Sequence, residues 1–243
     1  MKRLVAGPRA VEEALRAGPG QITVVYVQVD NDRVRELESR AKSAGVRCEP
    51  LPAAGLDAIA KGLRHQGVLA ITGDYAYAEL DVVLREAGPH PLLVALDQVT
   101  DPHNLGAIVR SAVAFGADGI LTLKDRAAPV TGVVVRASAG ATERARIVRV
   151  TNLTRTLEQL KALELEVVGL DADGATALCD VSFGHKGRVL VVGSEGHGLR
   201  RLVAQTCDTL ARIELGGPIA SLNASVAAGI ALYESARARR LLE

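Results

Sequence analysis

Asparagine, glutamate and arginine side chains follow apolar, strand-like runs in three segments of this 243-residue chain. Residues 96–110 read L-D-Q-V-T-D-P-H-N-L-G-A-I-V-R, residues 191–199 read V-V-G-S-E-G-H-G-L, and residues 213–223 read I-E-L-G-G-P-I-A-S-L-N. Each segment has the same order of a buried strand, a polar loop with glycine and a helix. In an open α/β sheet, such loops lie at the carboxyl ends of the strands, where ligands bind. The sequence therefore predicts a composite site built from three loops.

Each loop also has a purely structural interpretation. Asp101 and Pro102 suit the first turn of a helix, and the glycines of 191–199 suit a strand-to-helix turn. Ser221 and Asn223 can cap the long helix expected after them. Capping and chemistry are compatible, so these residues stay candidates for both.

Arg110 is harder to explain by capping alone. It lies six residues after Asn104 on the same expected helix, among apolar neighbours. An inward-facing arginine there needs an anionic or hydrogen-bonding partner, which favours a functional role. A guanidinium does not give up its proton at neutral pH, so electrostatic stabilisation suits Arg110 better than general-base catalysis. His197 is a weaker candidate for a general base.

Two regions position these loops. Residues 1–73 read as a compact α/β unit, and 74–91 read as a linker that ends at Gly88, Pro89 and Pro91. From residue 92 to 243, continuous apolar strands alternate with helices, which indicates a parallel sheet covered on both faces. In this second region we expect strands at 92–97, 119–123, 146–150, 165–170, 188–193 and 210–213, and helices near 103–116, 152–163, 198–204 and 221–240.

In the first region, we expect helices at 8–17, 31–43 and 54–61, and strands at 22–29, 46–49 and 67–72. The fold class is therefore α/β throughout.

Composition excludes several functional classes. The chain carries 29 basic and 28 acidic residues, a net charge of +1, so it has no uniformly basic coat. Two Phe, four Tyr and no Trp leave no aromatic platform for stacking several bases. Basic residues do cluster locally at 136–149, where they can meet phosphates or simply face solvent. No G-x-G-x-x-G follows a strand, which disfavours a dehydrogenase.

Cysteine spacing and the N-terminus point to the compartment. The three cysteines, Cys48, Cys179 and Cys207, match neither a C-x-x-C metal pattern nor a disulfide framework. The N-terminus lacks an apolar signal region, and no apolar run reaches the roughly 18 residues of a membrane span. We expect a soluble cytoplasmic protein with no bound metal and no membrane contact.

The three loop segments resemble the SpoU, or TrmH, family of RNA ribose 2′-O-methyltransferases. Asn104, Gly106 and Arg110 match its N-x-G-x-x-x-R motif, Glu195 matches the acid of G-x-E-G, and Asn223 matches the asparagine of S-L-N. The resemblance implies the SPOUT fold, a parallel-sheet domain with a deep trefoil knot. It also implies that residues 1–73 form an RNA-binding domain similar to ribosomal protein L30e.

The resemblance assigns roles to particular residues. The catalytic residues implied are Asn104, Arg110, Glu195 and Asn223. The implied S-adenosylmethionine site comprises Leu170, Gly193, Ser194, Gly196, Ile213, Leu215, Ser221, Leu222 and Asn223, with glycine at 193 where a side chain would collide with the cofactor. RNA contacts are implied for Arg9, which stands where the family commonly has histidine, and for Arg64, His65, Arg136 and Arg144.

The reaction implied is methyl transfer from S-adenosylmethionine to a ribose 2′-hydroxyl of RNA, with no metal. The preferred substrate is a guanosine of 23S rRNA, either naked or in a ribosomal precursor particle. Alternatives are tRNA, the rRNA site of thiopeptide resistance, and a non-catalytic RNA-binding protein. The family also implies a homodimer formed through the C-terminal domain, with an RNA site shared between two subunits.

Overall fold

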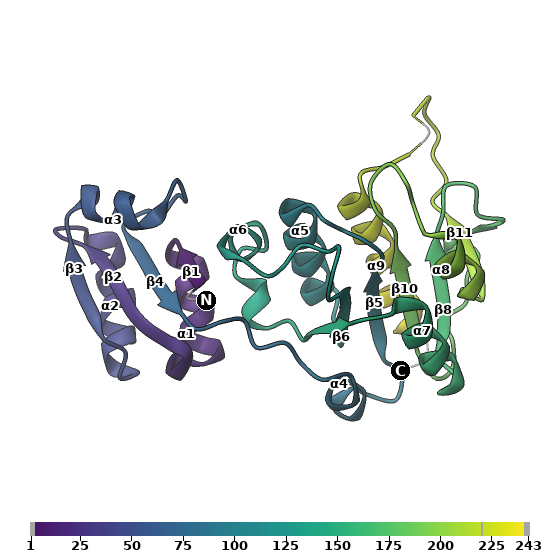
Figure 1. Cartoon of the computed structure of the whole chain (residues 1–243), viewed down its shortest axis with the longest axis horizontal. Helices are drawn as coiled ribbons and strands as arrows, with labels where there is room; N and C mark the ends of the chain where they lie inside the picture. The colour runs from purple at the N-terminus through teal and green to yellow at the C-terminus, as the bar shows by residue number, and fades with distance from the viewer. Residues whose placement is uncertain (1–2, 220, 241–243) are drawn as a thin grey trace. The chain divides into compact units, whose positions relative to one another are not determined.

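The computed structural model describes residues 3–219 and 221–240 and divides them into two compact units (Figure 1). Residues 3–76 and 129–144 form the first unit, and residues 77–128 and 145–240 form the second. The ranges expected from the sequence, 1–73, 74–91 and 92–243, are contiguous, whereas in the structure 129–144 packs with the first unit.

The first unit is a four-stranded mixed sheet with helices around it. Its strand order is β1-β4-β2-β3, and β2 runs parallel to β3 but antiparallel to β4. The strands are β1 (Arg3–Ala6), β2 (Ile22–Gln28), β3 (Cys48–Leu51) and β4 (Val68–Thr72). The helices are α1 (Pro8–Ala17), α2 (Asp32–Ser43), α3 (Ala53–Ala60) and α6 (Gly132–Ala137), with short 3₁₀ turns η1 (Pro19–Gln21) and η2 (Ala141–Glu143).

Two contacts explain why residues 129–144 join this unit. The buried guanidinium of Arg3 donates to both carboxylate oxygens of Glu143, at 2.7 and 3.0 Å, and to Thr72 Oγ1 at 3.0 Å. A Cβ at Gly132 would lie only 2.4 Å from the carbonyl oxygen of Leu4, so only glycine allows α6 to approach β1 this closely. A bidentate Arg–carboxylate pair fixes geometry as well as adding energy.

The second unit is built on a seven-stranded sheet in the order β7-β6-β5-β10-β8-β11-β9. Every strand pairing in this sheet is parallel, which confirms the expectation from the apolar runs. The strands are β5 (Leu92–Leu96), β6 (Gly119–Leu123), β7 (Ile147–Val150), β8 (Glu166–Leu170), β9 (Thr176–Ala177), β10 (Arg188–Val192) and β11 (Thr209–Arg212).

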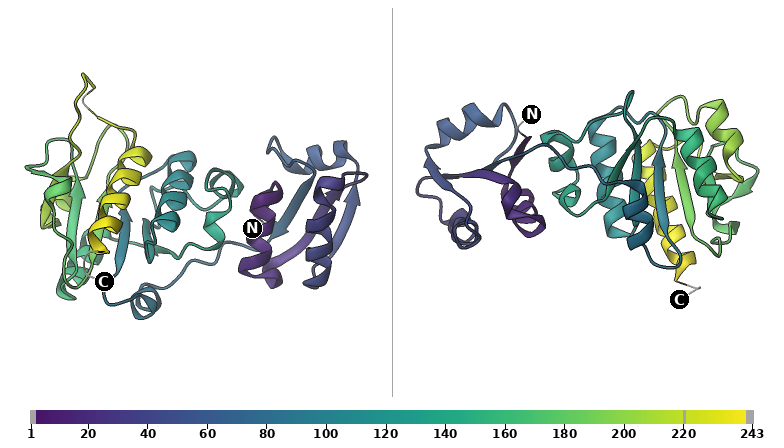
Figure 2. Two further views of the ribbon diagram at one scale, coloured as in Figure 1. Left: turned by 180° about the vertical axis from the view of Figure 1, so that it is seen from behind. Right: turned by 60° about the horizontal axis from the view of Figure 1, so that its bottom comes forward.

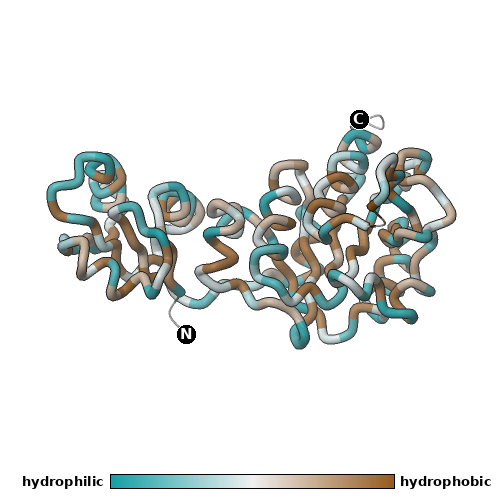
Figure 3. The backbone as a smooth tube through the Cα atoms, turned by 90° about the horizontal axis from the view of Figure 1, so that it is seen from above, coloured by the Kyte–Doolittle hydropathy of each residue, from teal (hydrophilic) through white to brown (hydrophobic). Residues whose placement is uncertain are grey.

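Helices cover both faces of this sheet. The helices are α4 (Leu80–Glu86), α5 (Pro102–Ala114), α7 (Leu153–Ala162), α8 (Arg201–Thr206) and α9 (Ala224–Arg239), with the 3₁₀ turn η3 (Leu178–Asp180). Val83 of α4, Leu157 of α7 and Val203 of α8 share one core with residues of the strands. The helices α5 and α9 lie side by side over the sheet (Figure 2). Figure 3 shows hydrophobic stretches, in brown, through the interior of this unit and more polar stretches, in teal, at many of its outer turns.

Three elements were not expected from the sequence: β1, α6 and the short β9. The helix expected at 221–240 begins at Ala224, because Asn223 is its cap. The knot stays a prediction, since sheet order alone does not define it. Within the described residues, no helix combines the length and apolarity needed to cross a bilayer.

Cys207 provides a test of the second unit's packing. Burial, reinforced by the neighbouring Asp208 carboxylate, raises the pKa of the Cys207 thiol to about 12. The folded chain therefore favours the neutral thiol, and the resulting stability is present below an unfolded pKa near 9.0 and is lost as the pH rises toward 12. At pH 8.5 we expect iodoacetamide to alkylate the exposed Cys179 and to leave Cys207 unmodified.

Peptide mass mapping of the alkylated protein checks this expectation. In guanidinium both thiols should react, which serves as the control. Equal alkylation rates of Cys179 and Cys207 in the native protein would contradict the packing described.

Candidate active site at the carboxyl ends of the parallel strands

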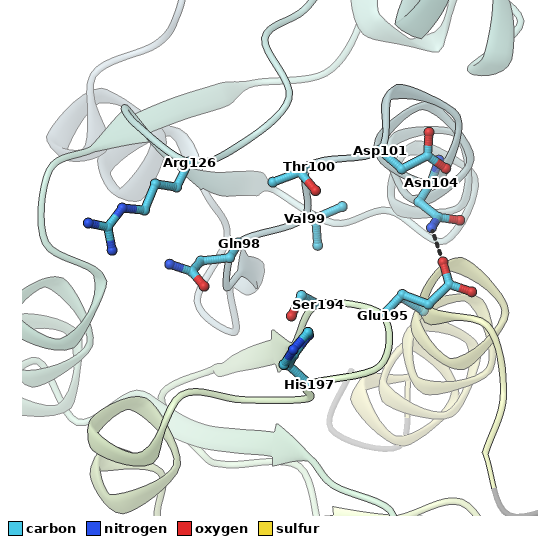
Figure 4. Close-up of a pocket in the computed structure, with 10 residues that line it drawn as sticks. Gln98, Val99, Thr100, Asp101, Asn104, Arg126, Ser194, Glu195 and His197 are labelled. Carbon is cyan, nitrogen blue, oxygen red and sulfur yellow. Dashed lines mark hydrogen bonds between the residues drawn. The ribbon is translucent and has the colours of Figure 1, made fainter.

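A cavity of about 490 Å³ opens at the carboxyl ends of β5, β6 and β10, three neighbouring strands of the parallel sheet. This volume lies within the range of roughly 300–1,000 Å³ that small-molecule and cofactor sites occupy. Figure 4 shows the side chains around it. The cavity is lined by Gln98, Val99, Thr100, Asp101, Asn104, Arg126, Ser194, Glu195, His197 and Ala224.

A hydrogen-bonded network joins Asn104, Glu195 and Asn223 at one end of this cavity. Asn104 Nδ2 donates to Glu195 Oε2 at 3.0 Å. Asn223 Nδ2 donates to Asn104 Oδ1 at 3.0 Å and to Glu195 Oε1 at 3.3 Å. The structure thus brings together three residues that the sequence analysis placed in one site. We call these three residues the amide–carboxylate network.

Helix caps orient the two amides. Asp101 caps α5 by accepting the backbone N–H groups of His103 and Asn104, at 3.1 and 3.3 Å. Asn223 Oδ1 accepts from Ser225 N at 2.9 Å and from Val226 N at 3.4 Å, and so caps α9. Because the oxygen of Asn223 is used by the cap, its Nδ2 is left to donate into the network. The capping and chemical interpretations of Asn223 are therefore both compatible with one geometry.

A buried carboxylate holds the loop that carries Glu195. Asp97, 1% exposed, follows β5 and accepts Arg200 N at 2.9 Å and Arg200 Nε at 2.7 Å. These bonds attach the loop after β10 to the end of β5. A carboxylate that is buried and paired at both oxygens keeps its partner's backbone in one place. Asp97 therefore fixes the segment from which Glu195 reaches Asn104.

The structure explains the glycine at position 193 differently from the sequence analysis, which expected a side chain there to collide with the cofactor. A Cβ at Gly193 would lie 2.2 Å from the carbonyl carbon of Gly198, inside the loop itself. Ser194 N donates to Gly198 O at 3.1 Å, and Gly198 N donates to Ser194 O at 3.0 Å, which closes the loop tightly. Glycine at 193 is thus required by the closure of its own loop, whether or not a ligand is bound.

Of the residues expected to bind a cofactor, Ser194 lines this cavity, whereas Leu170, Gly193, Gly196, Ile213, Leu215, Ser221, Leu222 and Asn223 are not among its lining residues. Leu170 ends β8 and pairs with Ala211 of β11, so the segments after both strands emerge at one edge of the sheet. Within the described residues, the backbone from 213 to 219 forms no backbone–backbone hydrogen bond. The loop between β11 and α9, which contains Ile213, Leu215, Ser221 and Leu222, therefore offers free backbone groups and half-exposed or exposed side chains.

Arg110 is exposed on α5 and does not line the cavity, so it does not need the partner that an inward-facing arginine would require. Six residues of α-helix place Arg110 about 9 Å along the axis and about 120° around it from Asn104. In the described part of the chain, no carboxylate pairs with Arg110. One copy of the chain does not assemble all four expected catalytic residues.

The expected RNA-contacting residues all lie in the first unit, and three of them are close in space. The start of α1 lies beside the turn before β4, because Gly7 N donates to Val68 O at 3.1 Å. Arg9 and Arg64 are exposed there. His65 closes this turn: its Nδ1 accepts Gly67 N at 3.1 Å, and its Nε2 therefore donates to Asp57 Oδ1 at 3.0 Å.

Arg136 and Arg144 lie in the segment 129–144 of the same unit. Arg136 is exposed near the end of α6, whereas the guanidinium of Arg144 pairs with Glu13, which raises the pKa of Arg144. The basic residues of 136–149 are divided between the two units. Arg146, before β7, pairs with Glu86, and Arg149 lies near the opposite end of that strand.

Sequence reasoning missed Gln98, Thr100 and Arg126, which line the cavity. Gln98 directly follows Asp97 at the end of β5, and Arg126 follows β6 by three residues. The rule that placed ligands at the ends of parallel strands could have indicated both. The described residues contain no group of three or more His, Cys, Asp or Glu side chains that could hold a metal ion.

The chain matches two protein-family models and several proteins of similar sequence. Residues 91–233 match the SpoU rRNA Methylase family, and residues 4–78 match the model described as RNA 2′-O ribose methyltransferase substrate binding. A tRNA/rRNA methyltransferase of Mycobacterium ulcerans, named as uncharacterized, is 48% identical over 240 residues, covering 97% of this chain and 77% of that protein.

Solved structures show the same fold. The SpoU methyltransferase AviRb of Streptomyces viridochromogenes, in complex with the cofactor AdoMet, matches 100% of this chain and 92% of its own, with a TM-score of 0.83 and 26% identity. An AdoMet-bound rRNA methyltransferase of Sinorhizobium meliloti matches 100% of this chain and 88% of its own, with a TM-score of 0.80 and 28% identity.

Proposed function

Because this chain belongs to the SpoU rRNA methylase family, we propose that it transfers a methyl group from S-adenosylmethionine to a ribose 2′-hydroxyl of RNA. The observation that carries the proposal is the amide–carboxylate network at the wall of the cavity, with both amides bonded to Glu195. A non-catalytic RNA-binding protein would have no need to keep these three polar side chains hydrogen-bonded to one another beside a cavity.

The residues around β8, β10 and β11 fit the cofactor. The unpaired backbone from 213 to 219 can bind the edge of an adenine, and Leu170 and Leu222 offer apolar contact beside it. We propose that the cofactor site comprises Leu170, Gly193, Ser194, Gly196, Ile213, Leu215, Ser221, Leu222 and Asn223. S-adenosylmethionine, when bound, supplies a methyl group on a sulfonium that departs as a neutral thioether. The AdoMet-bound relatives support this assignment.

The chain's own residues then have to orient the ribose and stabilise its charge. Glu195, held by two amides, can accept a hydrogen bond from the ribose and fix its position. Asn104 and Asn223 keep that carboxylate in one orientation. Negative charge develops on the 2′-oxygen as its proton leaves to solvent, and the oxygen then bonds to the methyl carbon while the bond from that carbon to the sulfonium sulfur breaks. Arg110 stabilises this charge as a cation, since its guanidinium stays protonated.

We propose that Arg110 reaches the network of a second copy. The helix α9 exposes Val226, Ile230 and Tyr233, at 49, 37 and 52%, in one stripe at helical spacing. Tyr233 contacts Phe115, the residue that follows α5, edge to face with ring centroids 5.8 Å apart, so the stripe continues beside the helix that carries Arg110. An exposed apolar face of this kind suits an isologous dimer, which supports a homodimer through the second unit.

We propose a guanosine of 23S rRNA as the substrate, in the cytoplasm where ribosomal RNA is processed. The substrate-binding model over residues 4–78 supports a folded RNA, and the exposed Arg9 and Arg64 support phosphate contacts near His65. Arg136 and Arg144 are further proposed contacts, the latter after release from Glu13.

Methyl transfer to separate pools of 23S rRNA, ribosomal precursor particles and tRNA tests the proposal. Purified protein and tritiated S-adenosylmethionine should label 23S rRNA at one nucleotide that then resists alkaline cleavage. Label in tRNA alone would preserve the chemistry and refute the substrate. S-adenosylhomocysteine should raise the melting temperature and NAD should not; an absence of both label and stabilisation would refute the enzyme assignment.

A further inference from the structure

Three exposed cations gather beside the cavity, at the carboxyl ends of β6 and β7: Lys124, Arg126 and Arg149. We call them the basic rim. Lys124 N donates to Val150 O at 2.8 Å, so the segment after β6 stays beside the end of β7. Arg149 donates to the carbonyl oxygen of Lys124 at 2.6 Å and lies 4.9 Å above the ring centroid of Tyr77. These contacts hold the rim in one shape.

The rim leads into the cavity. Arg126 belongs to the cavity wall, and Figure 4 shows its guanidinium on the same side as the amide of Gln98. Ala128 N donates to Val99 O at 3.0 Å, which ties the segment after Arg126 to the loop of Gln98. The cations therefore form a row across neighbouring strands. Arg149 lies near the end of β7, Lys124 and Arg126 follow β6, and the row ends at the cavity wall that the loop after β5 forms.

The cations of the basic rim differ from many arginines of this chain because, among the described residues, they have no carboxylate partner. Within residues 3–219 and 221–240, no carboxylate forms an ion pair with Lys124, Arg126 or Arg149. Many other arginines are neutralised by a neighbouring acid: Arg3, Arg16, Arg35, Arg40, Arg47, Arg144, Arg146, Arg188, Arg200, Arg212, Arg237 and Arg239. Asp125, exposed between Lys124 and Arg126, is the one acid within this segment, so the three cations still leave a local excess of positive charge in a chain with a net charge of only +1.

The backbone conformation of Gln98 and Arg126 supports a role in binding for their side chains. Gln98 and Arg126 both have a φ of 59°, in the left-handed region where glycine is the favoured residue. A glycine would relieve this strain, yet both positions carry long side chains that face the cavity. Strain of this kind is concentrated at binding and catalytic sites.

We propose that the basic rim binds the phosphates of the RNA strand that enters the cavity, and that Gln98 contacts the nucleotide inside it. Arg126 takes the phosphate nearest the methylated ribose, because it alone of the three cations lines the cavity. Lys124 and Arg149 hold the strand further along the sheet. The planar guanidinium of an arginine matches the geometry of a phosphate. Because Arg126 and Arg149 form no ion pair with a carboxylate of the residues that the structure describes, no such pair has to break before a phosphate binds. This inference rests on the proposed function for the identity of the strand.

RNA affinity measured against salt concentration tests the rim independently of catalysis. Each phosphate contact on a single strand contributes about 0.7 to the slope of log K against log salt concentration. In filter binding to 23S rRNA fragments, Arg126→Gly, which keeps the left-handed backbone, should weaken binding about tenfold and lower the slope by about 0.7. The triple variant Lys124→Ala/Arg126→Gly/Arg149→Gln should lower the slope by about 2. Arg126→Lys should retain the slope.

Arg155→Ala is the matched control, since Arg155 is exposed on α7 of the same unit, and in the described part of the chain no carboxylate pairs with it. It should leave the slope unchanged, and binding of S-adenosylhomocysteine should be the same in all variants. If Arg126→Gly and the triple variant bind RNA as Arg155→Ala does, the inference is wrong, even where the wild-type protein methylates RNA. If the variants lose affinity but the wild-type protein transfers no methyl group, the rim stands and the proposed function fails.

Discussion

Mixing two inactive variants, Arg110→Ala and Glu195→Gln, is expected to restore about a quarter of the wild-type methyl-transfer rate, if subunits of a two-fold dimer exchange at random. Half of the mixed dimers are then heterodimers. Each heterodimer has one site that combines an intact Arg110 from one copy with an intact Glu195 from the other. The expectation follows from the outward position of Arg110 on α5, away from the amide–carboxylate network.

Each variant alone should lower kcat by about 10²–10³, the usual effect of removing a group that stabilises or orients a developing oxyanion. Glu195→Gln replaces an acceptor of two amide N–H groups with a side chain that has only one acceptor oxygen. Arg110→Ala removes the cation that we assign to the 2′-oxygen. Rates of tritium transfer under single-turnover conditions, after co-expression or mild unfolding and refolding of the mixture, provide the measurement.

A second mixture is the control. Asn104→Ala and Glu195→Gln both affect the network of a single copy, and so every heterodimer has one defect at each site. This mixture should stay inactive. Equal recovery in the two mixtures, or recovery in neither, would contradict a site shared between copies.

Replacement of Arg188 by methionine is expected to lower the free energy of unfolding by about 3–5 kcal/mol, the usual cost of breaking a buried ion pair from one side. The side chain of Arg188 is 1% exposed and donates to Glu166 Oε2 at 2.9 and 2.7 Å. It also donates to Ser235 Oγ of α9 and to the carbonyl oxygens of Val181 and Ser182. Methionine would leave all of these acceptors without their donor.

Guanidinium unfolding followed by circular dichroism measures the effect. Arg146→Met is the matched control, because its ion pair with Glu86 is 44 and 51% exposed and should contribute only about 0–1 kcal/mol. A shift of the unfolding midpoint no larger in Arg188→Met than in Arg146→Met would show that Arg188 is not holding β10, the segment before it and α9 together.

The meeting of Asn104 and Glu195 could be predicted from the sequence because neighbouring parallel strands share an edge. The apolar runs that became β5 and β10 are continuous, which is typical of strands buried on both faces. Their carboxyl ends therefore deliver the following loops to one place. Asn223 could be predicted only through the family motif, since its place depends on the path of the chain between β11 and α9.

The helix α6 illustrates what local pattern could not supply. Its sequence, G-V-V-V-R-A, contains three consecutive valines, which favour strand over helix. Packing against β1 overrides that preference, through the contact at Gly132 and the pair of Arg3 and Glu143. The place of Arg126 just after β6 could have been predicted, but its left-handed backbone is set by the surrounding loops and has no local sequence signal.

The path of residues 129–144 determines whether the two units can be separated or exchanged. The chain passes between the two units three times, after residues 76, 128 and 144, so no single cut separates them. A fragment that begins at residue 77 would still contain α6 without β1, and would expose the buried Val134 and Val135 to water. Exchange of the N-terminal unit at a single boundary would therefore leave α6 without the strand that it packs against. A protein engineer who wishes to swap this unit must transplant two stretches of sequence together.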